Sequence, residues 1–392
     1  MDTRIEGNRI IACPDGKITT NNSREIEIEL YKILENAEGR ELVIDASNVE
    51  YVSSSGLRVF YKISSDLDSP LTIINVGPDL YTILDMTGFT TLLNVERKMK
   101  TIDISGCEVI GKGAVGTVYR LDDDNVVKVY DSPDCLDGIV NERNLARQAF
   151  IKGVPTAISY EIVKVGAGYG SVFELIRAKS MNDILVNDPD KIASVSEEYV
   201  NLLKKVHEVE VKPGDFPSAK ELFIGYIDAL KTVIPDDIAG AVKDKINAMT
   251  DDYHVVHGDP HLKNVMLTDD EPLFIDMDSI STGDPVFDLQ ALFVAYRAYN
   301  EDEPDNSIRF MGLSDGVCDD LWNRILHLYF EGKTQEEIKF QENKIKLLGY
   351  IRFLDRVVTA GMTRPELKEL RIRHTVEQLS LLINKVDSLN TH

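Results

Sequence analysis

Residues 257–264 read HGDPHLKN, and no other segment says more about the larger part of the chain. After a turn at residues 268–272, the sequence continues as LFIDMD. The Asp259 carboxylate can align an acceptor hydroxyl and take its proton, while Asn264 and Asp276 offer oxygen ligands to magnesium, a hard octahedral ion. One hairpin thus supplies the groups that phosphoryl transfer requires, since that reaction depends mainly on positioning and electrostatics.

Three histidines in the same region suggest a rival interpretation, a metal site formed by His254, His257 and His261. Ligation at these spacings would need a continuous helix. The strand-like pair Val255-Val256 and the interruptions at Gly258 and Pro260 disfavour a helix there. We expect His257 to orient the loop and His261 to have a local role.

A glycine-rich stretch, GKGAVGTV at residues 111–118, lies upstream. Gly111, Gly113 and Gly116 fit a spacing that two unrelated nucleotide sites share. Strand-like segments at 117–121 and 126–130 surround an acidic turn, which favours a hairpin that covers phosphates over a dinucleotide-binding unit. A plain glycine-rich turn is the alternative.

Lys128 lies within the otherwise apolar strand VVKVY, where a cation must reach the surface or meet an anion. Phosphate fits as that partner. Glu142, on the helix predicted at 139–151, is a candidate ion-pair partner that would orient Lys128 toward the α- and β-phosphates. Considered alone, Glu142 would be interpreted as a charged residue on the protein surface.

These elements occur in the order typical of the aminoglycoside phosphotransferase family, a branch of the protein-kinase-like fold that includes choline kinases. Residues 105–390 resemble that family: they contain H-G-D-x-x-x-x-N, the metal aspartate Asp276, and GDPVFDL at 283–289. The resemblance implies ATP and Mg²⁺ as cofactors and a hinge at FELI, 173–176. It also implies that backbone groups of Glu174 and Ile176 hold adenine and that Asp288 braces the catalytic loop.

Two features favour a small-molecule hydroxyl as acceptor, held by helices within residues 286–389. Only six residues separate Asp276 from Gly283, too few for a peptide-docking activation segment, and Gly258 replaces the arginine of H-R-D. The identity of the acceptor stays open.

An alternative is a partner-switch regulator whose kinase domain phosphorylates Ser55 or another protein. Nucleotide binding without catalysis is a third reading, disfavoured because the expected catalytic residues are present.

Residues 1–100 alternate strand-like and helix-like segments, which predicts a small α/β unit with helices packed on one sheet. The segment resembles the STAS domain of bacterial anti-sigma-factor antagonists. Its motifs are GKIT at 16–19, LVID at 42–45, VSSSGL at 52–57 and LDMTGF at 84–89. That resemblance implies a regulatory role and an anti-sigma-factor-like or other protein partner for residues 1–100.

The loop VSSSGL contains the serine that STAS domains present to a partner kinase, and the resemblance maps it onto Ser55. The chain departs from the family by placing Ser53 where aspartate is usual. Ser54 and Ser55 precede a predicted helix, where a hydroxyl can cap free N–H groups and a phosphate would meet the positive helix end. Capping and phosphorylation are both open for this loop.

The expected architecture is therefore two domains: an α/β STAS-like domain at 1–100 and an α+β bilobal kinase-like domain at 101–392. The β-rich N-lobe covers about 101–176 and the helical C-lobe about 177–392. Two late helices have capping-box starts, Thr334 with Glu337 and Thr363 with Glu366.

The charge and cysteine content of the chain limit the classes of partner and site that it can have. A net charge of −23 opposes nucleic acid and anionic membrane surfaces. We expect most of the acidic residues to be solvated, and a cationic ligand is still possible. Four cysteines lie far apart, so the sequence predicts neither a disulfide framework nor a zinc site. No basic-then-apolar leader and no membrane-length apolar run is present, so we expect a cytoplasmic protein.

Overall fold

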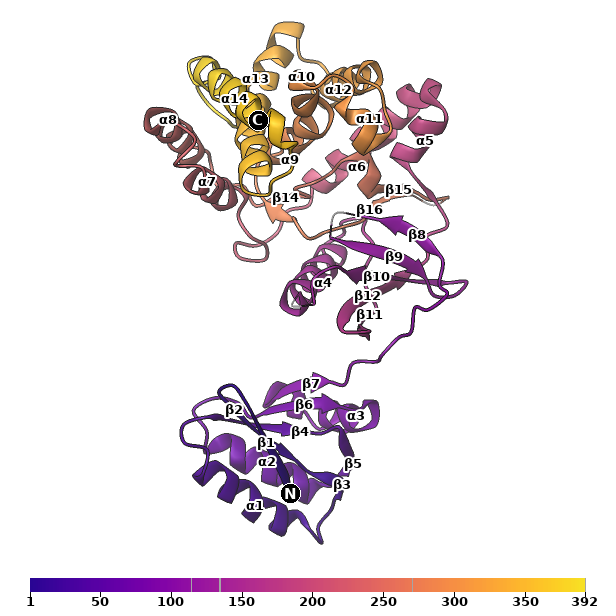
Figure 1. Cartoon of the computed structure of the whole chain (residues 1–392), viewed down its shortest axis with the longest axis vertical. Helices are drawn as coiled ribbons and strands as arrows, with labels where there is room; N and C mark the ends of the chain where they lie inside the picture. Colours follow the sequence, from indigo (N-terminus) through magenta and orange to yellow (C-terminus); the bar gives the residue numbers. More distant parts are fainter. Residues whose placement is uncertain (114, 134, 270, 392) are drawn as a thin grey trace. The chain divides into compact units, whose positions relative to one another are not determined.

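The computed structural model describes residues 1–113, 115–133, 135–269 and 271–391. The chain forms two compact units, one of residues 1–103 with 163–167 and one of residues 104–162 with 168–392. Figure 1 labels the elements of both units. Each unit has its own hydrophobic core.

The first unit is built on a five-stranded sheet with the order β1-β2-β4-β6-β7. Strands β2, β4, β6 and β7 are parallel, and β1 pairs antiparallel with β2. A second, parallel pair joins β3 and β5. The elements are β1 Asp2–Glu6, β2 Arg9–Cys13, β3 Asp15–Ile18, α1 Ser23–Glu35, β4 Glu41–Asp45, β5 Asn48–Val52, α2 Ser54–Ser65, β6 Thr72–Val76, α3 Pro78–Met86, a 3₁₀ turn Phe89–Thr91 and β7 Asn94–Arg97.

The burial pattern explains why this sequence forms a sheet with helices packed on it. Strand β4 is buried along nearly its whole length, as expected for a central parallel strand covered by other elements. Helix α2 presents a buried face that includes Leu57, Phe60 and Ile63. These side chains repeat at helical spacing and pack into the core of the unit. The predicted α/β class of residues 1–100 is confirmed.

The second unit begins with the antiparallel strands β12, β10, β9 and β8, accompanied by one long helix, α4. Strand β11 precedes β12 in the order of this sheet, and its residues are divided between the two units. In this sheet β10 pairs with both β9 and β12, so that it occupies the centre. The bounds are β8 Val109–Lys112, β9 Gly116–Arg120, β10 Asn125–Tyr130, α4 Leu136–Ile151, β11 Glu161–Val165 and β12 Gly168–Glu174.

The rest of the second unit is mostly helical, with short antiparallel strand pairs that carry the loops of the candidate site. Its elements are β13 Lys179–Ser180, α5 Met181–Asn187, a 3₁₀ turn Pro189–Lys191, α6 Ile192–His207, α7 Ala219–Ala229, α8 Asp236–Asn247, β14 Val255–Val256, a 3₁₀ turn Leu262–Asn264, β15 Val265–Leu267, β16 Pro272–Phe274, β17 Ser281–Thr282, α9 Val286–Phe293, a π-helical turn Val294–Ala298, α10 Tyr299–Asp302, α11 Asn306–Met311, α12 Asp315–Tyr329, α13 Gln335–Val358 and α14 Pro365–Leu382.

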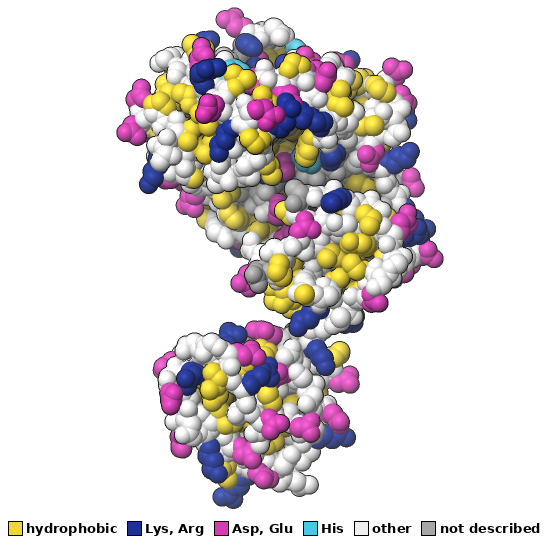
Figure 2. Space-filling model, in the orientation of Figure 1, with side chains coloured by type: hydrophobic (Ala, Val, Ile, Leu, Met, Phe, Trp, Pro, Cys, Tyr) yellow, Lys and Arg dark blue, Asp and Glu magenta, His cyan; other side chains and the backbone are white. Residues whose placement is uncertain are grey.

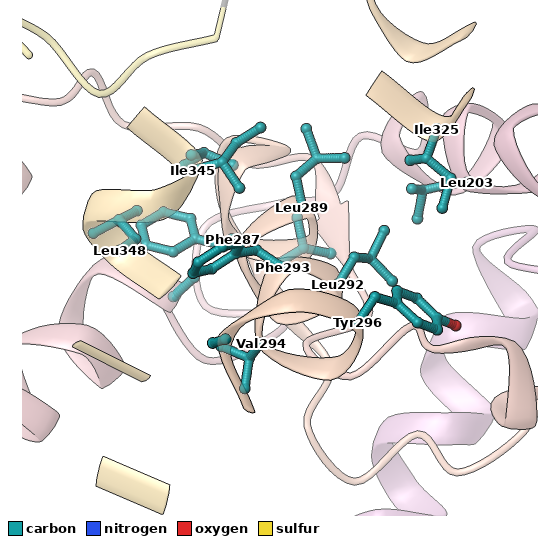
Figure 3. Close-up of a cluster of buried hydrophobic side chains, with 14 of the residues drawn as sticks. Leu203, Phe287, Leu289, Leu292, Phe293, Val294, Tyr296, Ile325, Ile345 and Leu348 are labelled. Carbon is teal, nitrogen blue, oxygen red and sulfur yellow. The ribbon is translucent and has the colours of Figure 1, made fainter. Parts of the chain in front are cut away.

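Helix α9 is the centre of this helical part, because every one of its residues is buried. A helix that is covered all round must be enclosed by other elements, and α9 packs against α13. Figure 3 shows its core, with labelled side chains Leu203, Phe287, Leu289, Leu292, Phe293, Val294, Tyr296, Ile325, Ile345 and Leu348. A β-rich part followed by a helical part confirms the bilobal architecture expected of residues beyond 100.

Of the two predicted helix starts, the one at Thr334 is confirmed and the one at Thr363 is wrong. Thr334 and Glu337 form both hydrogen bonds of a capping box at α13. Thr363 does not cap α14, which instead begins at Pro365 with Arg364 as its N-cap residue. Proline suits the first helical position because its missing N–H has no partner there in any case.

On the face shown in Figure 2, Asp and Glu side chains alternate with Lys and Arg, as in a solvated surface. Within the part of the chain that the structure describes, no helix combines the length and apolar character needed to cross a bilayer. Cys13, Cys107 and Cys318 are free cysteines.

Candidate active site

The loop of residues 257–264 connects β14 to β15, and glycine is required at its second position. Gly258 has φ +86°, a left-handed conformation that side chains disfavour. A Cβ atom there would lie 2.3 Å from the Ser279 carbonyl oxygen. The loop therefore passes against the backbone of the segment after β16, which brings Asp259 toward that segment.

Asp288 on α9 holds this loop through hydrogen bonds to its backbone. Its Oδ1 accepts a hydrogen bond from the Gly258 N–H at 2.6 Å, and its Oδ2 accepts one from the His257 N–H at 2.9 Å. The His207 Nε2 atom lies 2.9 Å from the same Oδ2. Burial alone would raise the pKa of Asp288, but the hydrogen bond and charge of His207, with the His257 contacts, lower it. The predicted bracing role of Asp288 is confirmed.

His257 is buried, and its hydrogen bonds fix its tautomer. The Asp259 N–H donates to His257 Nδ1 at 3.3 Å, so Nδ1 is the unprotonated acceptor. The protonated Nε2 then donates to the Ile275 carbonyl oxygen at 3.2 Å. One ring thus ties the catalytic loop to the segment that carries Asp276, as expected of a loop-orienting histidine.

The Asp259 side chain is 34% exposed and points to an accessible part of the site. His261 Nε2 lies 3.8 Å from Asp259 Oδ2, while burial lowers the pKa of His261 and favours its neutral form. Tyr199 donates a hydrogen bond to the Pro260 carbonyl oxygen at 2.6 Å, and the Leu262 N–H donates to Tyr296 at 2.9 Å. The loop backbone around Asp259 is thus held by buried partners.

Asn264 and Asp276 flank the β15–β16 hairpin: Asn264 ends the 3₁₀ turn before β15, and Asp276 follows the last residue of β16 by two positions. The Asn264 side-chain nitrogen donates to the Asp259 carbonyl oxygen at 3.0 Å, and the Ile275 N–H donates to the Asn264 carbonyl oxygen at 2.9 Å. Asp276 has φ +65°. Such a conformation is strained for a residue with a side chain and concentrates at functional sites.

Lys128 joins the two parts of the second unit. Its Nζ lies 3.2 Å from Glu142 Oε1 and 2.7 Å from Asp276 Oδ1. The Lys128 and Glu142 side chains are only 15% and 13% exposed, so Glu142 is not a surface charge. Tyr130 also donates to Glu142 at 2.9 Å.

The charges of this cluster depend on one another. Burial would lower the pKa of Lys128, but the Asp276 and Glu142 carboxylates raise it, so Lys128 is fully charged. Burial raises the pKa of Glu142, and Lys128 opposes that shift. A buried cation between two carboxylates is stable only as a complete set, since removing one partner leaves an uncompensated charge.

The glycine-rich stretch forms the β8–β9 hairpin. The Gly113 N–H donates to the Gly116 carbonyl oxygen at 2.9 Å, and a Cβ on Gly116 would lie 2.3 Å from the Val129 carbonyl oxygen. Gly111 lies on β8 and Gly116 on β9. The hairpin topology is that expected of a phosphate-covering turn, whereas a dinucleotide-binding unit would open a helix at these glycines. Ala114 lies outside the described residues.

The FELI segment, residues 173–176, lies at the end of β12. The Leu175 N–H donates to the Asp124 carbonyl oxygen at 2.7 Å, and Glu174 lies opposite Asn125. Hydrogen-bonded and non-hydrogen-bonded pairs alternate along an antiparallel ladder. The backbone N–H and C=O of Glu174 therefore point away from β10, and Ile176 follows immediately after the strand.

In the first unit, Ser53 and not Ser54 or Ser55 is the N-cap residue of α2. Its hydroxyl accepts a hydrogen bond from the Gly56 N–H at 3.4 Å. The expectation that Ser54 and Ser55 precede the helix is wrong, because both lie in its first turn. The Ser55 hydroxyl lies 3.1 Å from that of Thr20. Serine and aspartate cap helices about equally well, so Ser53 keeps the capping function of the usual aspartate.

Sequence reasoning missed two residues of the site. Asp278 follows Asp276 by two positions, and partial burial together with the nearby Asp276 carboxylate raises its pKa. The D-x-D spacing was visible in the sequence. His207, which lies on α6 and contacts Asp288, is separated from it by 81 residues, so no local pattern could have shown the pair.

Comparison with known proteins agrees with this geometry. The model of a family described as "Phosphotransferase enzyme family" matches residues 106–310. The chain belongs to the phosphotransferase enzyme family. The STAS domain model matches residues 1–117, so this phosphotransferase carries a STAS domain at its N-terminal end.

Individual relatives of this phosphotransferase fall into two groups. The putative anti-sigma factor antagonist BtrV of Bordetella bronchiseptica is 28% identical over 95 residues, which cover 24% of this chain and 80% of BtrV. The ADP-bound crystal structure of the aminoglycoside phosphotransferase APH(2'')-Ib is 13% identical and covers 70% of this chain and 93% of that one, with a TM-score of 0.47. A choline/ethanolamine kinase family protein from Mesorhizobium loti is 19% identical and covers 71% and 87%, with a TM-score of 0.44.

Proposed function

We propose that this phosphotransferase moves the γ-phosphate of ATP to a hydroxyl group of a small molecule. The observation that carries the proposal is the Lys128 ammonium, buried between Glu142 and Asp276 at the edge of the loop that bears Asp259. A fixed, fully charged lysine is suited to hold nucleotide phosphates, and Glu142 keeps it in place when phosphates replace part of its contact with Asp276.

The proposed chemical step uses Asp259 as the group that aligns the acceptor hydroxyl and takes its proton. Its exposure leaves room for an acceptor, while His257 and Asp288 hold the backbone on either side of it. Holding the reacting groups in line lowers the barrier by removing the entropic cost of their encounter.

A magnesium ion fits the oxygen atoms that this hairpin offers. The Asn264 side-chain nitrogen is committed to the Asp259 carbonyl, which leaves the side-chain oxygen as the end available to a cation. Asp276 contributes a second oxygen. Within the described residues, no group of three or more His, Cys, Asp or Glu side chains could hold a metal by itself. Magnesium needs no such group, because it binds through one or two protein ligands together with phosphates and water. When bound, it would neutralise charge on the phosphates.

The nucleotide is proposed to lie under the β8–β9 hairpin, with Gly111, Gly113 and Gly116 allowing close approach of the backbone to the phosphates. The Glu174 backbone, which points away from β10, and that of Ile176 are proposed to hold adenine. ATP and magnesium are supplied inside the cell, so the proposed reaction is cytoplasmic.

The test is phosphate incorporation from γ-labelled ATP into a pool of small metabolites, with magnesium present. We expect labelled small-molecule product with the wild-type chain and none with Asp276→Ala. Retention of full activity by Asp276→Ala would contradict the proposed metal role, and absence of any transfer with the wild-type chain would contradict the function.

A partner switch is the second candidate, and the Ser55 hydroxyl in the first turn of α2 is the observation that favours it. A phosphate there would meet the positive end of the helix. In this proposal residues 1–100 form a regulatory domain separate from 101–392, and they bind an anti-sigma-factor-like protein. ATP-dependent labelling of the protein that disappears in Ser55→Ala would favour the switch. Labelling that is unchanged in Ser55→Ala would exclude this serine.

A further inference from the structure

A cavity of about 310 Å³ lies in the second unit beside the catalytic loop. Gly258 and Asp278 line one end, next to Asp259. Phe223 and Tyr226 of α7 form an apolar wall. The volume lies at the small end of the range for small-molecule sites, and an apolar wall with a few polar groups is their usual lining. Because Gly258 directly precedes Asp259, the cavity offers space for a small molecule next to the loop that carries Asp259.

Arg352 of α13 lines the same cavity and is the one cationic residue among the described residues of its lining. Its side chain is 11% exposed, and the guanidinium lies over the Tyr226 ring, 4.7 Å from the centroid. Its closest carboxylate contact within the described residues is Asp355, at 3.9 Å. That distance is too long for a hydrogen bond, and the structure shows no side-chain hydrogen bond from Arg352 within the ranges it describes.

A guanidinium offers five N–H donors in a planar arrangement that matches carboxylate and phosphate oxygens. A largely enclosed guanidinium with none of these donors in a protein hydrogen bond is therefore suited to an anion that enters the cavity. The Arg352 charge is opposite in sign to the net charge of −23 of the whole chain, which by itself would attract cations, and the same lining also carries the Asp278 carboxylate. The lining of the cavity, and not the overall charge, decides which ligands can be bound inside it.

Gln290 of α9 gives a second polar observation on the same wall. It is 1% exposed, and its nitrogen donates to the Phe287 carbonyl oxygen at 2.8 Å, which fixes the orientation of the amide. The Oε1 atom is buried and has no hydrogen-bond partner within the described chain. A buried acceptor without a donor is costly. Because Gln290 lines the cavity, an O–H or N–H group of a bound ligand would supply the missing donor.

We propose that this cavity binds the phosphate acceptor and that the acceptor is a small alcohol carrying an anionic group, which Arg352 recognises. The proposal rests on the proposed function and adds the class of its substrate. The acceptor O–H loses its proton to Asp259, a new bond forms between this oxygen and the γ-phosphorus, and the bond from that phosphorus to the ADP oxygen breaks. The products are a phosphate ester, ADP and a proton.

The test compares probes that share a ring and a hydroxyl and differ in the charge of one group. We would use 3-phenyllactate as the anionic probe, 3-phenylpropane-1,2-diol as the neutral probe and phenylalaninol as the cationic probe. Glycerol 3-phosphate against glycerol forms a separate arm that distinguishes a phosphate group from a carboxylate. Binding to the full chain is measured by calorimetry without nucleotide, and turnover is measured separately with labelled ATP.

In at least one arm, the anionic probe should bind about 30-fold more tightly than its neutral counterpart. The reason is that an ion pair between the anionic group of the probe and the buried Arg352 guanidinium contributes strongly to affinity. In Arg352→Met this ratio should fall to near 1, and Arg352→Lys should restore part of it. Arg373→Met, which changes an exposed arginine of α14, should keep the wild-type ratio.

Tighter binding of the neutral or cationic probes would overturn the proposal, as would failure of every anionic probe to bind. An anionic preference that survives in Arg352→Met would also overturn it. The wild-type comparison stands even if a variant does not fold. Failure of the proposed function has a different signature, namely anionic probes that bind while labelled ATP transfers phosphate to none of them.

Discussion

Asp288→Asn tests the support of the catalytic loop, because this change keeps the size of the side chain and removes one acceptor oxygen. In the wild-type chain both oxygens accept backbone N–H groups, from Gly258 and from His257. Whichever way the amide is turned, its NH₂ group faces one of these two donors. One buried N–H then loses its partner, which costs about 1–3 kcal/mol.

The chain offers a convenient probe for this measurement. Its single tryptophan, Trp322, is 2% exposed and lies in the core of the second unit, so its fluorescence reports the unfolding of that unit alone. We expect Asp288→Asn to lower the free energy of unfolding in urea by about 1–3 kcal/mol. Phosphate transfer should fall about 100-fold, since a displacement of the loop by about 1 Å misplaces Asp259.

The pH dependence gives an independent check. The pKa of Asp288 is lowered in the folded state, so its contribution to stability is present above the ordinary carboxyl range and is lost on acidification. The stability difference between wild type and Asp288→Asn should therefore shrink as the pH falls below about 4. Asp244→Asn, at an exposed position of α8, is the matched control and should change neither quantity. An Asp288→Asn protein as stable and active as this control would refute the reasoning.

Three further predictions concern other elements. Gly258→Ala should lower both stability and phosphate transfer, because its methyl group would meet the Ser279 carbonyl oxygen at 2.3 Å; a fully active variant would contradict the loop geometry. Thr334→Ala should lower the free energy of unfolding reported by the single tryptophan by about 1 kcal/mol through loss of the capping box with Glu337, and no change would show that the box contributes nothing. Although burial opposes it, hydrogen bonds lower the pKa of Asp45 to about 2, so Asp45→Asn should weaken hydrogen-exchange protection of the first unit at pH 7. That effect should fade as the pH drops toward 2, and equal protection at both pH values would contradict it.

The order of the sequence motifs was enough to predict the fold class of both parts. Hydrophobic periodicity indicated the helices α1 and α2, and the unbroken apolar run of β4 indicated a buried central strand. The edge strand β1 was not predicted, because all five of its residues are exposed and carry no burial pattern. The false helix start at Thr363 shows that a short capping pattern loses to a proline two positions later.

The proposed catalytic and metal-binding residues are close together in sequence, whereas the groups that support them are not. Asp259 and Asn264 precede the β15–β16 hairpin and Asp276 follows it, so their spacing was visible in the sequence. The contact of His207 with Asp288 depends on the packing of α6 near α9, which no single stretch of sequence encodes. The cavity lining likewise combines α7, α9 and α13, and Arg352 gained its meaning only once these helices were placed together.

Measuring phosphate transfer by Asp259→Asn tests directly whether the Asp259 carboxylate takes the proton of the acceptor hydroxyl. The substitution keeps the size of the side chain and removes the carboxylate that takes the proton. With γ-labelled ATP and magnesium, transfer to small-molecule acceptors should fall by a factor of about 100 or more, while binding of a fluorescent ATP analogue is retained. Transfer at the wild-type rate by Asp259→Asn would contradict the mechanism.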